Sequence, residues 1–281
     1  MNKGKIKIVI AMLIWGSVGV FARFSGLSGL GVAFARVSLG SIFLLIILGA
    51  KRRIREALDC IARNPLPYIG IGSALALNWI FFFTGLEYTT IANVVLVYYT
   101  SPIIATLLSW KFLKEKVKKS RMFAISLAFL GLGIIISGQE ISINNRDFIG
   151  IMFALIAAFF YALIPNLGRF LKKVKGEILT FLQLLVASFL MLPIISVVDV
   201  GKPVWWSIGV LVTVHTVLAL FLYMDGLKEV SVSEAALLSY LDPISAVIYG
   251  IIIFGEVPSI YTIIGGGLIL IATALDALKK G

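Results

Sequence analysis

Charged side chains are scarce in this sequence. Asp, Glu, Lys and Arg make up 14% of its 281 residues, against about a quarter in soluble domains. Hydrophobic residues make up 60%, which excludes a soluble globular domain and indicates an integral membrane protein. Cysteine and histidine occur once each, as Cys60 and His215, so an internal disulfide is excluded and no cluster of metal-ligand residues accompanies Cys60.

Motifs for phosphate chemistry are also missing. The glycines follow no strand pattern and precede no Lys-Ser/Thr pair, so neither a dinucleotide site nor an ATP site is expected. An enzyme within the membrane would need a converging nucleophile, base or metal set. One histidine, no paired carboxylates and one loop cysteine do not supply it, so we predict no enzymatic activity, no cofactor and no metal.

Long apolar runs fill most of the chain. A helix needs about 20 apolar residues to cross a bilayer, and the runs show no period-two alternation of the kind that barrel strands have. The sequence therefore predicts an all-α integral membrane protein with ten transmembrane helices. Their expected positions are 6–24, 32–48, 66–86, 91–110, 122–137, 148–167, 178–198, 204–224, 235–254 and 260–275.

The formal net charge of +11 follows the positive-inside rule. With a cytoplasmic N-terminus, most basic residues fall on the cytoplasmic side, and only Arg23, Arg36, Arg146 and Lys202 lie elsewhere. Both termini are therefore predicted to be cytoplasmic, and no nucleic-acid partner is needed to explain the charge. Segment 51–63 spaces its apolar residues at helical intervals between charges, which predicts a helix lying in the membrane interface.

The chain contains an internal repeat. A shift of 141 residues aligns 68–134 with 209–275 and places Tyr99 on Tyr240, Pro102 on Pro243 and Glu115 on Glu256. The sequence therefore predicts two halves, 1–140 and 141–281, of five helices each. Because five is odd, the second half must lie inverted in the membrane, as in secondary transporters.

The repeated prolines, Pro102 and Pro243, lie within long apolar runs. A proline removes one helical hydrogen bond and kinks the helix, so the pair predicts two helix kinks near a central site between the halves. The alternative is that each proline is a packing kink without a role in transport.

Each half carries Gly-Leu, then Tyr-x-x-Pro-Ile-x-Ala, then a glutamate and a glycine-bearing span. With Trp15-Gly16 and the AFAR stretch that ends at Arg36, this order resembles the EamA domain of the drug/metabolite transporter superfamily, over essentially the whole chain. The resemblance implies ten helices around a central cavity, cytoplasmic termini and movement of small metabolites, often amino acids outward. The small multidrug-resistance relatives carry a glutamate in helix 1, which is absent from 6–24, so proton-coupled cation export of that type is disfavoured.

Three ionisable residues within the spans are candidates for the site, because such groups are costly in a membrane. Arg36 could hold a carboxylate by two parallel hydrogen bonds, or it could be a snorkelling or structurally paired arginine near the outer interface. Asp242 could bind an ammonium group, pair with Arg36 or His215, carry a proton, or cap a helix. His215 could relay protons or simply be a satisfied interior hydrogen-bonding residue.

Uncharged and aromatic residues complete the predicted cavity, although an aromatic cluster at helical spacing also fits ordinary packing. The uncharged candidates are Asn78, Tyr98, Tyr99, Gln183 and Tyr240, and the aromatic ones are Trp15, Trp79, Phe81, Phe82 and Tyr161. Close helix packing is expected at Gly16, Gly19, Gly131, Gly133 and 265–267. Glu115 and Glu256 are expected to cap helix ends or to pair with nearby bases.

These patterns predict a secondary active transporter in the cell membrane that exports a small metabolite by alternating access. An amino acid or a related zwitterion or organic anion is the expected substrate. The expected partners of the protein are this small molecule, the lipid bilayer and a coupling ion, which could be either a proton or sodium. The alternative is a flippase for a lipid or polyprenyl-linked carrier, since the same fold can open sideways.

Overall fold

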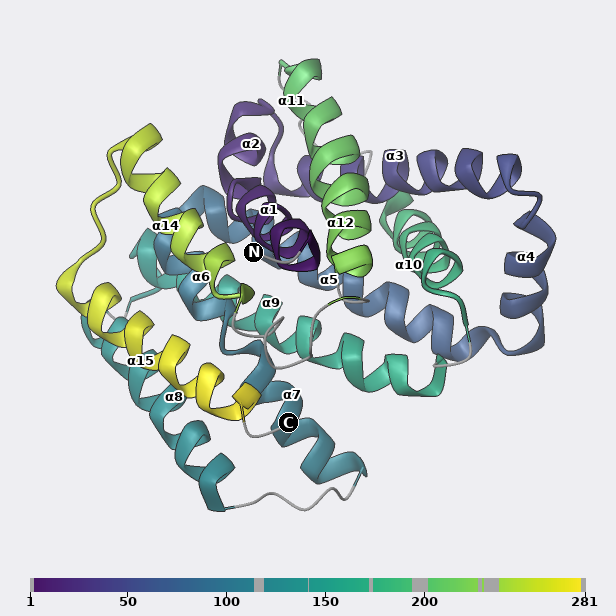
Figure 1. Cartoon of the computed structure of the whole chain (residues 1–281). Helices are drawn as coiled ribbons and strands as arrows, with labels where there is room; N and C mark the ends of the chain where they lie inside the picture. The colour runs from purple at the N-terminus through teal and green to yellow at the C-terminus, as the bar shows by residue number, and fades with distance from the viewer. Residues whose placement is uncertain are drawn as a thin grey trace.

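The computed structural model describes residues 3–113, 119–140, 142–171, 174–193, 202–226, 229 and 238–278. Every regular element among these residues is a helix (Figure 1). In the first part of the chain the helices are α1 Lys3–Gly16, α2 Val18–Phe24, α3 Gly29–Ala50, α4 Ile54–Arg63, α5 Pro65–Tyr88, α6 Ile91–Tyr98, α7 Ser101–Leu113 and α8 Lys119–Ser137. In the second part they are α9 Arg146–Gly168, the 3-10 helix η1 Arg169–Leu171, α10 Gly176–Met191, α11 Trp205–Val210, the π-helix η3 Leu211–Leu218, α12 Ala219–Gly226, α14 Leu241–Phe254 and α15 Ile260–Leu278.

Apolar helices occur at all ten positions where the sequence predicts spans. Five stretches are both long and apolar enough to cross a membrane, and five further apolar helices are shorter. The long ones are Lys3–Phe24, Gly29–Ala50, Pro65–Tyr88, Ile91–Leu108 and Arg146–Gly168. The chain is thus an all-helical membrane protein, while length alone identifies half of the predicted spans.

Several helices begin at residues that satisfy their free N–H groups. The Ser28 side chain accepts from Gly31 N at the start of α3, and Thr90 accepts from Asn93 N at the start of α6. Such caps stabilise a helix by about 1 kcal/mol. The sequence does not reveal that a turn at Ser17 separates α1 from α2.

The repeated prolines do not lie in the middle of continuous helices, which corrects the expectation of a mid-helix kink. A turn at Tyr99 and Thr100 ends α6, and Pro102 is the second residue of α7. Pro243 is the third residue of α14 and also follows a turn. The first turn of a helix tolerates proline because its N–H would have no partner there. Each proline therefore marks the point where a helix restarts.

The helices form a bundle in which α5 lies in the interior. It packs against α9, α10 and α3, while α1 packs against α12 and α14. Helices α8 and α15 lie side by side at the edge of the bundle (Figure 1). We refer to the end of the bundle where α2 ends and α3, α6 and α9 begin as the Arg23 end, and to the opposite end as the Lys7 end.

Helix α4 confirms the predicted amphipathic segment. Ala57 is fully buried, whereas Leu58 is 53% exposed. Arg53, which precedes the helix, donates to Glu56 at 2.9 Å and pairs with Glu177 at the start of α10. The hydrogen bond from Arg53 holds the pKa of Glu56 below its ordinary value. These contacts tie α4 to the Lys7 end.

Glycines permit the close contact of α8 and α15, as the sequence predicts for Gly131 and Gly265. A Cβ atom on Gly131 would collide with the Gly265 carbonyl and lie 3.1 Å from Leu268 Cβ. A Cβ atom on Gly133, two residues further on, would meet nothing within 4 Å. Gly133 and Gly267 therefore do not take part in the predicted close packing, because they point away from neighbouring helices.

This difference predicts opposite effects of two alanine substitutions on one helix. We expect Gly131→Ala to lower the stability of the folded protein by about 1–3 kcal/mol through overpacking. Gly133→Ala should be neutral or stabilise by up to about 1 kcal/mol, since alanine favours helix more than glycine does. Thermal unfolding of both variants in detergent measures the effect. Equal melting temperatures would show that the α8–α15 contact does not limit stability.

Candidate functional site

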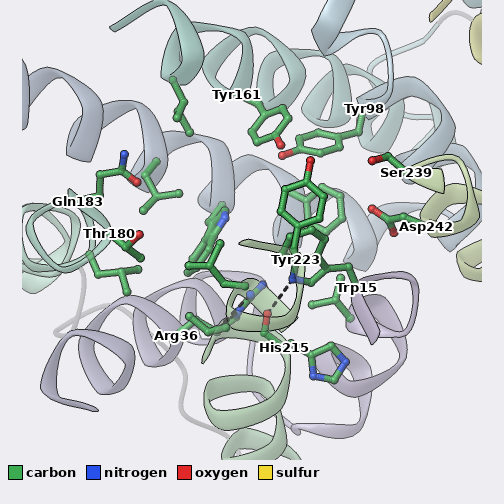
Figure 2. Close-up of a pocket in the computed structure, with 18 of the residues that line it drawn as sticks. Trp15, Arg36, Tyr98, Tyr161, Thr180, Gln183, His215, Tyr223, Ser239 and Asp242 are labelled. Carbon is green, nitrogen blue, oxygen red and sulfur yellow. Dashed lines mark hydrogen bonds between the residues drawn. The ribbon is translucent and has the colours of Figure 1, made fainter. Parts of the chain in front are cut away.

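A cavity of about 530 Å³ lies inside the bundle, surrounded by the long helices and by η3 (Figure 2). Ten of the thirteen cavity candidates named from the sequence line it: Trp15, Arg36, Trp79, Phe82, Tyr98, Tyr99, Tyr161, Gln183, His215 and Asp242. The cavity reaches along α10 as far as Gly176, the first residue of that helix at the Lys7 end.

Arg36 lies on α3 with 7% of its surface exposed. Its Nε and Nη2 both donate to the Thr216 hydroxyl oxygen at 3.2 Å. The guanidinium carbon lies 4.1 Å from the centre of the Trp79 ring and 5.4 Å from that of Phe83. Among the described residues no carboxylate pairs with Arg36, and its Nη1 has no hydrogen-bond partner.

This environment argues against a snorkelling or an ion-paired Arg36. The residue is buried in the cavity wall, so it does not snorkel to an interface. In the part of the chain that the structure describes, neutral groups alone, a hydroxyl and two aromatic rings, stabilise its charge. An unpaired buried charge is costly, and the planar guanidinium keeps N–H donors free on the side that can bind a carboxylate with two hydrogen bonds.

The π-helix η3 places the residues opposite Arg36. The Thr216 hydroxyl donates to the Leu211 carbonyl at 2.9 Å, five residues earlier, which leaves its oxygen lone pairs to accept from Arg36. The His215 carbonyl accepts from Trp15 Nε1 at 2.9 Å. Wide π turns often occur at functional sites because they displace side chains and free backbone carbonyls. Here the wide turn supplies acceptors to both Arg36 and Trp15.

His215 has protein partners at both ring nitrogens. Nδ1 donates to the Val210 carbonyl at 3.3 Å, and Nε2 lies 2.9 Å from the Ser17 hydroxyl. The ring also packs on Phe21, with the ring centres 4.9 Å apart. This geometry matches a satisfied interior histidine that lies at the cavity wall and links the α1–α2 turn to η3.

Asp242 lies on the first turn of α14, across the cavity from Arg36 (Figure 2). Its Oδ2 lies 2.9 Å from the Tyr99 hydroxyl, which is also 3.1 Å from the Ser239 carbonyl. No base among the described residues forms an ion pair with Asp242, so it pairs with neither Arg36 nor His215. The described lining of the cavity thus carries one basic and one acidic side chain that do not pair with each other.

Aromatic rings form much of the wall between these two groups. Tyr98 and Tyr161 have ring centres 5.1 Å apart, and Trp15 and Tyr223 have ring centres 5.3 Å apart. The remaining surface is therefore mainly apolar, with few polar groups at defined positions. Small-molecule sites have this composition.

Three predicted cavity residues do not line the cavity: Asn78, Tyr240 and Phe81, whose ring packs instead on Phe153 and Phe160. Asn78 is fully buried, and its amide donates to the Tyr98 hydroxyl at 3.1 Å and to the Ala157 carbonyl at 2.9 Å. It faces α9 because of its position on α5. Asn78 therefore orients the Tyr98 hydroxyl without lining the cavity itself. Tyr240 lies in the turn before α14 and outside the lining.

Four polar lining residues were not predicted from the sequence: Thr180, Thr216, Tyr223 and Ser239. Thr216 and Ser239 each lie close in sequence to a predicted residue, His215 and Asp242. A helical sequence does not reveal which neighbour faces the cavity when the helix is widened or interrupted. Glu115, which the sequence predicts to cap a helix end or to pair with nearby bases, lies outside the described residues.

Thr216 provides a test of how Arg36 is held. We expect Thr216→Val, which removes the shared acceptor, to raise the KM for transport about tenfold, equivalent to about 1.4 kcal/mol. The maximal rate should change less, because the chief loss is the orientation of Arg36 in binding. Thr216→Ser keeps the hydroxyl and should restore the wild-type KM. A serine variant as impaired as the valine variant would point to packing of the threonine methyl group instead.

Relatives of this chain come from bacteria and archaea. "Uncharacterized transporter YxxF" of Bacillus subtilis (strain 168) is 28% identical over 280 residues, which cover 98% of this chain and 89% of that protein. An "Uncharacterized transporter" of Archaeoglobus fulgidus is 27% identical over 271 residues, covering 96% and 94%. A solved crystal structure with 19% identity superposes with a TM-score of 0.67, over 99% of this chain and 97% of that one.

A family profile described as the EamA-like transporter family matches residues 2–137 and again residues 148–276. The proteins of similar sequence are named as transporters, and the likeness to a solved structure extends over the whole fold. The chain is therefore a multi-pass membrane transporter rather than an enzyme. It belongs to the EamA-like transporter family, within the drug/metabolite transporter superfamily.

Proposed function

We propose that this protein is a secondary active transporter of a small metabolite that carries both a carboxylate and an ammonium group. The observation that supports this most directly is Arg36, a buried arginine without a carboxylate partner among the described residues, in a cavity whose opposite wall carries Asp242. Ionisable groups at membrane depth are costly and mark substrate pathways. An amino acid or related zwitterion satisfies both groups, and an organic anion satisfies Arg36 alone.

Alternating access between two inverted halves, 1–140 and 141–281, is the proposed mechanism. It is supported by the 141-residue repeat in the sequence and by the two separate matches to the family profile. Five helices in each half give ten spans, five of which meet the length of a bilayer by themselves. A site between such halves can face either side of the membrane in turn.

The proposed orientation places the Lys7 end in the cytoplasm of the cell, with the protein in the plasma membrane. The basic residues of α4 lie at this end, as the positive-inside rule requires. Because the cavity reaches Gly176 at the Lys7 end, a cytoplasmic metabolite would bind from there and leave at the Arg23 end. We therefore propose export, driven by a proton or sodium gradient or by exchange.

Counterflow in proteoliposomes tests the proposal. Vesicles loaded with an unlabelled pool of amino acids and related metabolites should accumulate labelled pool members, and empty vesicles should not. Uptake by the folded wild-type protein would give the substrate class. If no pool member is exchanged, the same protein should be tested for movement of labelled lipid or polyprenyl-linked substrates, because that result would favour a flippase over the proposed metabolite transporter.

A further inference from the structure

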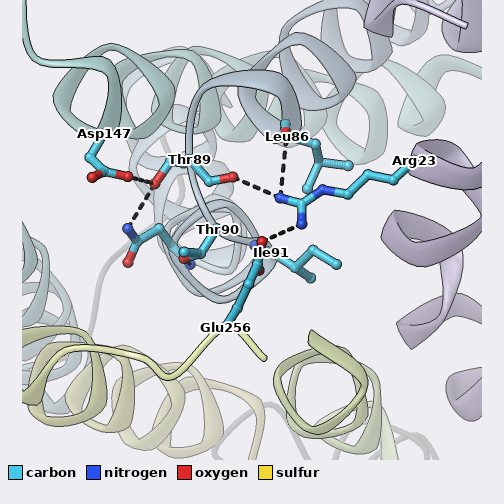
Figure 3. A network of polar contacts seen from close by, with 8 residues as sticks. Arg23, Leu86, Thr89, Thr90, Ile91, Asp147 and Glu256 are labelled. Atoms are coloured by element: carbon cyan, nitrogen blue, oxygen red, sulfur yellow. Dashed lines mark hydrogen bonds and ion pairs between the residues drawn. The ribbon is translucent and has the colours of Figure 1, made fainter. Parts of the chain in front are cut away.

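A second polar cluster, away from the cavity, lies at the Arg23 end (Figure 3). Arg23, in the last turn of α2, pairs through Nη1 with Glu256. Its Nη2 donates to the Thr89 carbonyl at 2.9 Å and to the Leu86 carbonyl at 3.2 Å. Arg23 thus binds the C-terminal carbonyls of α5, where the negative end of the helix dipole favours a cation.

Glu256 also binds the N-terminus of α6, the helix that follows α5. Its Oε2 accepts from Ile91 N at 2.9 Å, and Ile91 is the first residue of α6. The first N–H groups of a helix have no partner within the helix, and a carboxylate there is favoured by the dipole. One carboxylate therefore satisfies both Arg23 and the free end of α6.

The local sequence explains how Glu256 reaches this position. Gly255, with φ +67°, ends α14 in the left-handed conformation, where its N–H donates to the Ile251 carbonyl at 3.0 Å. Glu256 N then donates to the Gly250 carbonyl at 3.2 Å. This reversal is a common helix end that suits glycine. It turns the chain so that the Glu256 side chain reaches α6 and α2.

The pair links the two proposed halves. Arg23 and Ile91 belong to 1–140, whereas Glu256 belongs to 141–281. The Arg23 side chain is 24% exposed and that of Glu256 is 17% exposed, so solvent screens the pair less than an open surface pair. The cavity, by contrast, reaches the Lys7 end at Gly176.

We propose that Arg23 and Glu256 are a gating pair that holds the Arg23 end closed. The inference rests on the proposed alternating access, because a site open at one end must be sealed at the other. When the Arg23 end opens, the halves separate there, and the ion pair, its bonds to α5 and the cap on α6 are lost together. The pair therefore favours the state closed at this end, and neutralising it shifts the population towards the opposite state.

Accessibility of a cavity cysteine tests this without knowledge of the substrate. In a Cys60→Ser background, which removes the only native thiol, Val18→Cys places one thiol in the cavity wall. A membrane-impermeant thiol reagent is applied separately to each side of right-side-out and inverted vesicles. We expect Glu256→Gln to raise the modification rate from the Arg23 side about tenfold and to lower it from the Lys7 side. Arg23→Gln should have the same effect, and the double variant should add little to either.

Glu87 provides the matched control. It is another glutamate at the Arg23 end that accepts from a helix N-terminus, Gly29 N of α3, but both residues belong to the first half. Glu87→Gln should leave modification from both sides unchanged. Modification of Glu256→Gln at the wild-type rate, or an equal rise from both sides, would overturn the gating role. The thiol modification rates can be measured without a substrate. If Glu256→Gln changes these rates as expected but the wild-type protein shows no counterflow, the gating role is retained and only the proposed substrate is overturned.

Discussion

Replacement of Arg36 by glutamine is expected to lower the rate of substrate transport at least about a hundredfold. A charge-assisted hydrogen bond contributes about 1.5–3 kcal/mol, and a bidentate contact to a carboxylate would supply two. Arg36→Lys keeps the charge but loses the planar fork that contacts Thr216 and stacks on Trp79. We expect the lysine variant to lose about tenfold. Initial rates of counterflow measure both.

The stability of the folded protein should not fall when Arg36 is replaced. Arg36 is buried without a carboxylate partner among the described residues, so its charge costs free energy in the folded protein. Arg36→Gln should therefore unfold at the same temperature as wild type or at a higher one. Loss of transport together with retained stability would separate a binding role from a structural one, because removing a structural arginine would destabilise the bundle.

Arg146→Gln is the matched control for Arg36. Arg146 also stacks on an aromatic ring, Tyr88, at 4.9 Å and donates to a neutral acceptor, the Glu87 carbonyl, at 2.9 Å. It lies exposed at the Arg23 end and outside the cavity. We expect this variant to transport at the wild-type rate. A wild-type rate for Arg36→Gln as well would exclude Arg36 from substrate binding.

The positions of the helices were predictable because membrane insertion imposes a strong one-dimensional pattern. Runs of apolar residues near bilayer length can satisfy their backbone polar groups only as helices. Among the described residues, an apolar helix overlaps each predicted run, and five of these helices are shorter than a membrane span. The amphipathic helix α4 was predictable for a similar reason, since its charged and apolar residues alternate at helical spacing. Where helices break was less predictable. Proline favours a helix start at Pro102, whereas nothing in the sequence marks the turn at Ser17.

The cavity was partly predictable because few polar groups occur at membrane depth, and most of them point inward. The prediction that Asn78 lines the cavity is wrong, because its amide donates to the Tyr98 hydroxyl and to the Ala157 carbonyl. These contacts depend on how α5 packs on α9, which the sequence does not reveal. Thr216 was missed because its role depends on the π turn that separates it from Leu211. The partner of Glu256 was also missed, since Arg23 is 233 residues away in sequence.

Replacement of Asp242 by asparagine is expected to change which substrates bind. Asp242 keeps a hydrogen bond from Tyr99 but has no base partner among the described residues. If it binds the ammonium group of a zwitterion, Asp242→Asn should lower transport of that zwitterion about a hundredfold. Tyr99→Phe, which removes one neutral donor, should cost about tenfold or less. Asp59→Asn, on the exposed face of α4, should have no effect.

The decisive comparison for Asp242 uses a substrate pair that differs only in its ammonium group. For an amino acid and the matching organic acid without the amine, the wild-type protein should prefer the amino acid. Asp242→Asn should remove that preference because the organic acid needs only Arg36, while Arg36→Gln should impair both compounds. Competition of each compound against labelled substrate in counterflow gives the ratios. An unchanged preference in Asp242→Asn would show that the carboxylate does not contact the amine, since specificity is the difference between the two affinities and a lost contact to one compound changes it.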